Sequence, residues 1–413
     1  MKKYRQRAAL TVGLGWAFGT WALAQNVLTA DEAVATALKN SPAVKASGLV
    51  VRQHEQLVRS ARTIPNPDVT FDSPSGTFYT LGVQQSFRFP TVYTQQAQLQ
   101  QQQTVLAQKE KIVTENDLNF RIRTLYLNAQ YAEAYLKQLQ SQDSVYAEIA
   151  VAAKRNFEAG TIDKLALIFA ETQAADVRNQ AAVASQELTT AKRQLMLFMN
   201  NQQGASLQVS KGQETGFALL PLTVRQSDRL SFAILLTDSE LSKNPLVEVA
   251  KQSEVINQKI IEVEKANALP GFMVGYYNQS ARETHLAYRW RVGVSIPLWA
   301  GQYKSRIAAA QTGQEVARQR TEAQTQVLSV DLQAAQGEAV KFQNSLDFYE
   351  TVALQQAGDI ISTARRLFES GQTDYINFLR TTNDAYQIRL RYVETLRSYN
   401  QSILTINYLK GTL

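Results

Sequence analysis

Phe157-Glu158-Ala159-Gly160-Thr161-Ile162-Asp163 returns about 211 residues later as Phe368-Glu369-Ser370-Gly371-Gln372-Thr373-Asp374, with Phe, Glu, Gly and Asp in register. Each Gly follows a long helical pattern and can adopt the left-handed backbone conformation that ends a helix. Each Asp lies three residues further on, where its side chain can cap the next helix. The two copies therefore predict two tight turns between helices, and they indicate that the chain is a duplicated unit.

The segments around these turns predict the same layout twice. Repeat 1 covers residues 25–200, repeat 2 covers 241–413, and 201–240 form an equatorial linker between them. In repeat 1 we expect a helix that begins near Pro42, a hairpin over 68–89, a long helix over 91–157, the turn over 157–163 and a return helix over 163–200. In repeat 2 we expect a helix that begins near Pro245, a hairpin over 272–297, a long helix over 301–368, the turn over 368–374 and a return helix over 374–409.

The helix lengths and heptads predict an elongated arrangement. At 1.5 Å per residue, the first long helix is about 100 Å long, its return helix about 57 Å and the helix from Pro42 about 32 Å. The two short helices nearly add up to the long one, so stacking them end to end gives two rods per repeat. Apolar residues recur at spacings of four and three in both long helices, from Leu118 and from Leu328. These heptads are offset by about 210 residues and the turns by about 211, so one residue is inserted at a place that the sequence does not define.

One predicted strand of repeat 2 has a wholly apolar and aromatic face, formed by Leu286, Tyr288, Trp290, Val292, Val294 and Ile296. Arg289 and Arg291 alternate with these residues and belong to the opposite face. The equivalent strand of repeat 1, from Tyr79 to Phe87, alternates less cleanly. A two-stranded hairpin is not stable alone. The four strands of the chain must therefore pair with one another or with strands of other subunits.

The N-terminal residues and the composition indicate export. Four basic residues precede an apolar run from Ala8 to Trp21, and Ala22-Leu23-Ala24 ends it with the pattern of a secretory signal peptide over 1–24. The chain has no cysteine, so neither a disulfide nor a lipid-modified N-terminal Cys is possible. Removing the signal lowers the formal net charge from +7 to about +3. This charge gives no support to a nucleic-acid partner.

The layout resembles the TolC-like outer-membrane efflux family, the outer membrane factors of tripartite pumps, across nearly the whole chain after residue 24. The resembling segments are Asn40–Pro42, Asn244-Pro245, Phe87–Pro90, Ser295–Gly301 and the two turns. The resemblance implies an α+β membrane protein that is mostly α-helical and located in the cell outer membrane. In such a homotrimer, four strands from each chain close a twelve-stranded transmembrane β-barrel, continuous with a coiled-coil barrel of helices in the periplasm. A closed barrel satisfies every backbone polar group in lipid.

By this resemblance the two turns contact a periplasmic adaptor protein, which links the channel to an inner-membrane pump of RND or ABC type. The contact residues would be Phe157, Gly160, Thr161, Asp163, Phe368, Gly371, Gln372 and Asp374. The apolar strand face would contact outer-membrane lipid, and Arg289 and Arg291 would face the lumen. Helices beside the second turn would close the tube, with Asn377 and Arg380 as gate candidates. Many family members have acidic residues there, so this departure argues against an acidic ring. Arg380 either faces the lumen, where three copies would disfavour cations, or pairs with a neighbouring carboxylate.

No pattern in the chain predicts an enzyme, a cofactor or a metal site. His54 and His285 lie in polar surroundings without ligand-spaced acids, and Met196 and Met199 lie among apolar residues, which favours core packing. There is no nucleophile and base arrangement and no phosphate loop. The sequence therefore predicts a passive exit duct for efflux or type I secretion, with an exported coiled-coil scaffold as the alternative class. It leaves open whether the solute is a metal ion, a drug, a peptide or a protein.

Overall fold

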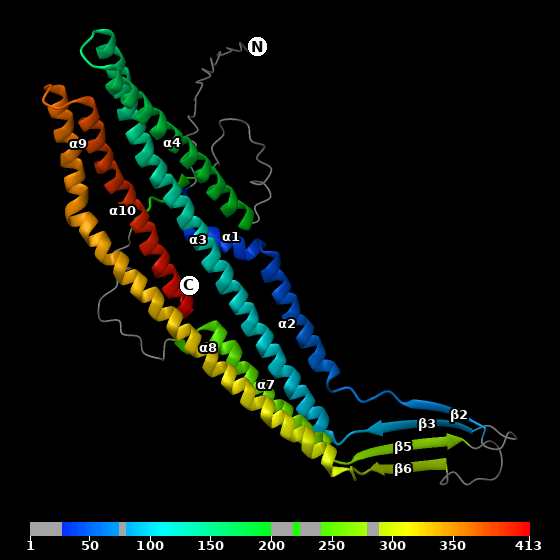
Figure 1. Cartoon of the computed structure of the whole chain (residues 1–413). Helices are drawn as coiled ribbons and strands as arrows, with labels where there is room; N and C mark the ends of the chain where they lie inside the picture. The colour runs from blue at the N-terminus through cyan, green and yellow to red at the C-terminus, as the bar shows by residue number, and fades with distance from the viewer. Residues whose placement is uncertain (1–26, 74–79, 200–217, 224–240, 279–288) are drawn as a thin grey trace, which may run out of the picture.

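The computed structural model describes residues 27–73, 80–199, 218–223, 241–278 and 289–413. The signal peptide expected over 1–24 and most of the linker 201–240 lie outside these ranges. The elements, labelled as in Figure 1, are β1 (Val27–Leu28), α1 (Ala30–Asn40), α2 (Pro42–Ser60), β2 (Asp68–Asp72), β3 (Thr80–Phe87), α3 (Pro90–Glu158), α4 (Lys164–Phe198), β4 (Ala218–Leu219), α7 (Pro245–Asn267), β5 (Gly271–Asn278), β6 (Trp290–Ser295), α8 (Ala300–Phe348), a π-helical turn (Tyr349–Ala353), α9 (Leu354–Glu369) and α10 (Tyr375–Lys410). None of the helices in the described ranges combines the length and apolar character needed to span a bilayer.

The helices form four rods that run side by side (Figure 1). The long helix α3 packs against α2 and α4 on one flank and against α7 and α10 on the other, while α8 packs on α7 and α10, and α9 packs on α10. The rods therefore lie in the order α2/α4, α3, α7/α10 and α8/α9. In the first and third rods two shorter helices follow each other end to end, α2 with α4 and α7 with α10. The heptad residues form the cores between rods, and Leu332 and Tyr399 are fully buried. The outer rods, α2/α4 and α8/α9, form the two edges of the row.

At one end of the rods, β2, β3, β5 and β6 form an antiparallel sheet in that order. Cross-strand partners lie on the same face of a sheet. Apart from Gln85 and Asn278, the first face is apolar and carries Val69, Phe71, Leu81, Val83, Phe87, Phe272, Val274, Tyr276, Trp290, Val292 and Val294. The other face carries small, polar and charged residues with Tyr277 and Met273. The sheet is open in the single chain, and β2 and β6 are its edges.

The second long helix is not the continuous helix that was expected over 301–368. A single π-helical turn, Tyr349–Ala353, separates α8 from α9, and the two helices meet at a bend (Figure 1). A π-helical turn accommodates one residue more than an α-helical turn and bends the helix. Tyr349 aligns with Leu139 at an offset of about 210, whereas Ala364 aligns with Ala153 at about 211. The inserted residue therefore lies in the π-helical turn, while the helix expected over 91–157 is the unbroken α3.

A small element at the middle of the rods is absent from the sequence prediction. β1 and β4 pair in parallel, with Val27 opposite Ala218. The hydroxyl of Tyr126 donates to the carbonyl of Leu28 (2.7 Å) and accepts from the N–H of Leu220 (3.2 Å). Burial of this side chain raises the pKa of Tyr126. Its two hydrogen bonds attach the start of repeat 1 and part of the linker to the middle of α3.

Lys109 of α3 and Glu248 of α7 form an ion pair between the repeats, with Nζ 2.8 Å from Oε2. The hydrogen bond from Lys109 holds the pKa of Glu248 below its ordinary value. A carboxyl group whose pKa is lowered on folding stabilises the fold above its unfolded pKa, and this contribution is lost as the pH falls through the folded pKa. We expect Lys109→Met to lower the thermal unfolding midpoint slightly at about pH 7 and by less at about pH 3, where more of the Glu248 carboxylate is protonated. An equal decrease at both pH values would show that the ion pair is not responsible.

Lys111→Met is the matched control for this prediction. Lys111 pairs with Glu115 on the same helix at 3.4 Å, and such exposed pairs contribute little. The thermal unfolding midpoint of Lys111→Met should therefore change with pH in the same way as that of the unsubstituted protein.

Candidate functional site

The two turns, named tip 1 (157–163) and tip 2 (368–374), have the conformation that the sequence predicts. Gly160 and Gly371 both have a φ of 74°. The Asp163 and Asp374 carboxylates accept hydrogen bonds from the first turn of the following helix, at 2.8 and 2.7 Å. Both tips lie at the same end of the rods, opposite the sheet (Figure 1).

The tips differ in how they hold their phenylalanine. The Phe368 ring of tip 2 packs against Tyr375 and Phe378, with ring centroids 4.6 and 4.7 Å away. The equivalent positions of tip 1 are not aromatic, and Phe157 is 38% exposed. Phe157 of tip 1 is therefore partly exposed, whereas the equivalent Phe368 of tip 2 packs against helix α10.

A ladder of three hydrogen bonds joins the α3/α4 hairpin to the α9/α10 hairpin. From the tips inward, the bonds are Asn156 Nδ2 to Tyr375 Oη (2.8 Å), Tyr146 Oη to the Leu379 carbonyl (3.2 Å) and Gln142 Nε2 to Asn383 Oδ1 (3.3 Å). Tyr146 and Leu379 are fully buried in the apolar cluster between the hairpins. Buried hydrogen bonds cost more to break than exposed ones, because the separated groups lose their partners. The ladder therefore holds the two hairpins of a chain together.

The two gate candidates lie in different surroundings. The backbone N–H and the side-chain amide of Asn377 both donate to the Asp374 carboxylate, at 2.7 and 3.0 Å, so this side chain is part of the helix cap. Arg380 is exposed on α10 and forms no ion pair within the described part of the chain. The alternative in which Arg380 pairs with a neighbouring carboxylate is therefore not observed among the described residues.

On the polar face of the sheet, Tyr277 packs against two glycines. A Cβ at Gly82 would lie 2.5 Å from Cδ1 of Tyr277, and a Cβ at Gly275 would lie 2.9 Å from its Cε2. The ring is only 9% exposed, and its hydroxyl donates to Gln84 Oε1 at 2.8 Å. The guanidinium of Arg291 lies 4.3 Å above the ring centroid. Two glycines thus make room for a ring that positions Arg291 on this face.

The strand residues selected from the sequence lie as follows. Arg291 is on the face opposite Trp290, Val292 and Val294, and Arg289 donates to Asn278 Oδ1 at 3.4 Å. The apolar side chains of β6 are exposed in the single chain, Val292 by 78%, and Ile296 is exposed just beyond the strand. Leu286 and Tyr288 lie outside the described residues.

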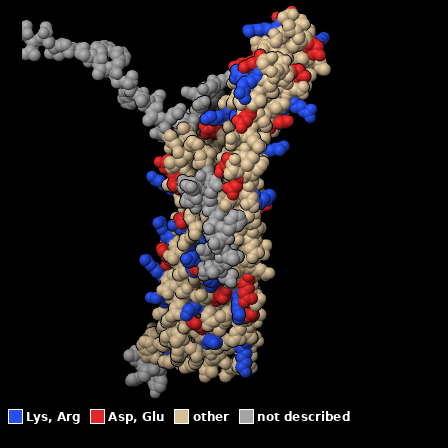
Figure 2. Space-filling view, turned by 90° about the vertical axis from the view of Figure 1, so that its left-hand side faces the viewer, with Lys and Arg blue, Asp and Glu red and all other residues tan. Residues whose placement is uncertain are grey.

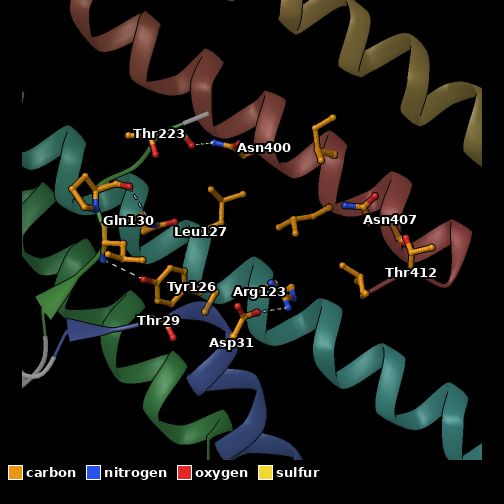
Figure 3. A pocket seen from close by; sticks show the side chains of 16 residues that line it. Thr29, Asp31, Arg123, Tyr126, Leu127, Gln130, Thr223, Asn400, Asn407 and Thr412 are labelled. Carbon is orange, nitrogen blue, oxygen red and sulfur yellow. Dashed lines mark hydrogen bonds and ion pairs between the residues drawn. The ribbon is translucent and has the colours of Figure 1, made fainter. Parts of the chain in front are cut away.

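A pocket of about 430 Å³ lies between α3 and α10 at the level of β1 and β4 (Figure 3). The Arg123–Asp31 ion pair (2.6 Å) and Tyr126 lie on its lower side, and Asn400 donates to the Thr223 carbonyl (3.4 Å) on its upper side. Amides, hydroxyls and leucine side chains alternate along its wall. None of the described lining residues forms a nucleophile and base pair, and the polar ones offer hydrogen bonds.

The sequence did not predict the two histidines or Met196 and Met199 as metal ligands. Nδ1 of His54 lies 3.0 Å from Nε2 of Gln100. Met196 and Met199 are 7% and 6% exposed, and His285 lies outside the described residues. Among the residues that can be described, no three metal-ligating side chains come together.

Charges of both signs are interspersed along the face shown in Figure 2, which includes the α8/α9 edge. This face offers no patch of one sign, so it gives nucleic acid no basic surface.

The rods, the four-stranded sheet at one end and the two helical tips at the other define the fold of the TolC-like outer-membrane channels, and the resemblance inferred from the sequence is confirmed at the level of the fold. The structure of CusC superposes with a TM-score of 0.75 and 16% identity over 99% of both chains. The Campylobacter jejuni CmeC outer membrane channel superposes with a TM-score of 0.76 and 13% identity, covering 93% of this chain and 85% of that one. In sequence, the chain is 22% identical over 391 residues to the cobalt-zinc-cadmium resistance protein CzcC of Cupriavidus metallidurans, covering 93% of this chain and 90% of the relative. No family model matches the chain.

Proposed function

We propose that the chain is the outer-membrane exit duct of a tripartite efflux or type I secretion system, and that it passes solutes outward without chemistry. The two-faced sheet is the observation that carries this proposal. One face exposes valines and Trp290, and the other carries Arg291 and Tyr277. Strands that meet lipid on one side and a water-filled lumen on the other require this alternation. The shared fold with CusC and CmeC supports the same function.

The duct is a homotrimer in this proposal. A single chain leaves β2 and β6 as sheet edges and α2/α4 and α8/α9 as edges of the helix row. An open strand edge in lipid would leave backbone groups without partners. Pairing β6 of one copy with β2 of the next joins different surfaces, and such heterologous contacts close into a ring when the rotation permits. Three copies supply twelve strands, which form the outer-membrane barrel, and their rods form the periplasmic tube.

The tips face the periplasm in this arrangement, and we place the adaptor there, with the inner-membrane pump beyond it. Tip 1 presents the exposed Phe157, and both tips present a backbone shaped by a left-handed glycine. Arg380, exposed on α10, stays a candidate for the entrance of the tube. In this proposal the inner-membrane pump selects the solute.

Gly371→Val should impair export while leaving the trimer in the membrane. A β-branched residue at a φ of 74° is strained by roughly 1–2 kcal/mol or more, and nothing lies within 4 Å of an added Cβ, so the strain is confined to the tip. Export is measured by the growth of cells in the presence of the exported compound, and assembly by the yield of trimer in the membrane. Gly358→Ala is the control, because a Cβ also meets nothing there and the backbone is helical. Normal export by both Gly371→Val and Gly160→Val would remove the tips from the proposed function.

Membrane fractionation distinguishes the duct from an exported coiled-coil scaffold. The duct is expected as a heat-resistant trimer in detergent extracts of outer membranes. A protein recovered only from the soluble periplasmic fraction would support the scaffold and refute the duct.

A further inference from the structure

A second pocket, of about 430 Å³, lies where the sheet meets the rods, at the lower right of Figure 1. The starts of α3 and α8, the end of α7 and the adjoining strand ends form its wall. Two arginines, Arg88 and Arg306, line it together with Gln302 and Tyr303. Both arginines are exposed, and neither forms an ion pair with another described residue. None of the described lining residues is acidic, so the two positive charges are not neutralised within the pocket.

Two helix starts add to the positive potential of this pocket. Phe89 and Trp299 immediately precede α3 and α8, and both line the pocket. Neither side chain caps its helix. The start of a helix carries a partial positive charge and attracts anions. The pocket therefore combines two guanidinium groups with the positive ends of two long helices.

The strand register places the pocket on the polar face of the sheet. Phe87 pairs with Phe272 on the apolar face, so Arg88, the next residue, belongs to the opposite face by alternation. Gly271 pairs with Ser295 on that polar face, and both residues line the pocket. In the proposed duct the polar face lines the lumen. The pocket would therefore meet solutes where the tube of helices gives way to the barrel.

We propose that this pocket binds a soluble oxyanion, that is, a phosphate or carboxylate group, inside the duct. A guanidinium group can form two parallel hydrogen bonds with such a group. The amide of Gln302 and the hydroxyl of Tyr303 are further donors on the same wall. Neither Arg88 nor Arg306 was selected from the sequence.

This inference rests on the proposed function, since it needs a lumen formed by three copies. The three copies would place six arginines around the passage from the tube to the barrel. A lumen lined by one sign of charge concentrates ions of the opposite sign. The duct would therefore favour anions over cations at this level, whichever solute the pump delivers.

Trp299 provides a fluorescent probe in the pocket. Its side chain is 80% exposed, and residues 25–413 contain one other tryptophan, Trp290. In detergent-solubilised trimers of Trp290→Phe, quenching by iodide, an anion, is compared with quenching by neutral acrylamide at constant ionic strength. Iodide should quench Trp299 efficiently because the pocket attracts it, and inorganic phosphate should reduce this quenching by competing for the arginines.

Arg88→Gln and Arg306→Gln, each added to Trp290→Phe, should lower the ratio of iodide to acrylamide quenching several-fold. Lys304→Gln is the matched control, because it removes the same charge from an exposed residue of the first turns of α8 that does not line the pocket. Its ratio should stay unchanged. In planar bilayers with a KCl gradient, the reversal potential should shift toward cation selectivity in both arginine variants and not in Lys304→Gln.

Equal quenching ratios and equal reversal potentials in the arginine variants and Lys304→Gln would overturn the anion site. In lipid nanodiscs, quenching of Trp299 by phospholipids brominated in their acyl chains, without protection by inorganic phosphate, would overturn the soluble source and indicate a lipid phosphate. A protein that yields no trimer from outer membranes would instead refute the proposed function, so the two failures are distinguishable.

Discussion

Gly82→Val should leave little or no folded trimer in the membrane. An added Cβ would lie 2.5 Å from Cδ1 of Tyr277 and 2.6 Å from Oγ1 of Thr70, and valine adds two further methyl groups. The ring has little room to move, because it also packs against Gly275 and bonds to Gln84. Overpacking of this kind typically costs about 1–3 kcal/mol and occasionally more. The proposed trimer would contain three such sites, each where β3 of repeat 1 pairs with β5 of repeat 2.

The yield of heat-resistant trimer and its unfolding in denaturant measure this effect. Tyr277→Ala in the same chain removes the ring, so the double variant should recover part of the trimer that Gly82→Val loses. Gly48→Ala in α2 is the control, since a Cβ there meets nothing within 4 Å. If Gly82→Val assembles normally, the packing of Tyr277 on the glycines does not determine the shape of the sheet.

Val292→Arg should prevent stable insertion of the sheet. Val292 is 78% exposed on the apolar face, so in water this substitution would cost roughly 0.5 kcal/mol or less. In a bilayer an arginine on the lipid face costs about 2–4 kcal/mol near the midplane, and a trimer carries it three times. The amount of inserted protein lost in Val292→Arg therefore shows whether the apolar face contacts water or lipid.

Ser295→Arg is the matched control, because it places the same charge on the same strand but on the polar face, opposite Gly271. It should insert normally, as judged by the trimer in outer-membrane extracts. If Val292→Arg and Ser295→Arg both yield full amounts of protein, the apolar face does not lie in lipid.

Local chemistry accounts for what the sequence could predict. The left-handed glycines and capping aspartates of the tips need only their neighbours in the chain, and the alternation from Trp290 to Ile296 gives the strand its two faces without further information. Helix lengths alone gave the end-to-end stacking of short helices along α3. These features depend on residues that are close in sequence or on simple geometry.

Contacts between distant residues account for what the sequence missed. The packing of Tyr277 on Gly82 joins residues of different repeats, and no periodicity indicates which glycine a ring will cover. The two-residue strand β1 is too short to have a pattern, and it is held by Tyr126 from the middle of α3. The Asn156–Tyr375 bond likewise joins positions 219 residues apart.

The extra residue in the π-helical turn has a consequence for the partner that binds the tips of the proposed trimer. The π-helical turn takes up the extra residue and bends the helix, so α9 does not continue the line of α8 as the tip half of α3 continues its own. In the proposed ring of three chains, this bend and the different packing of Phe157 and Phe368 divide the six hairpins into two alternating sets of three. A partner protein that binds all six hairpins must recognise two different shapes. A partner that recognises only one shape would bind as three copies per trimer.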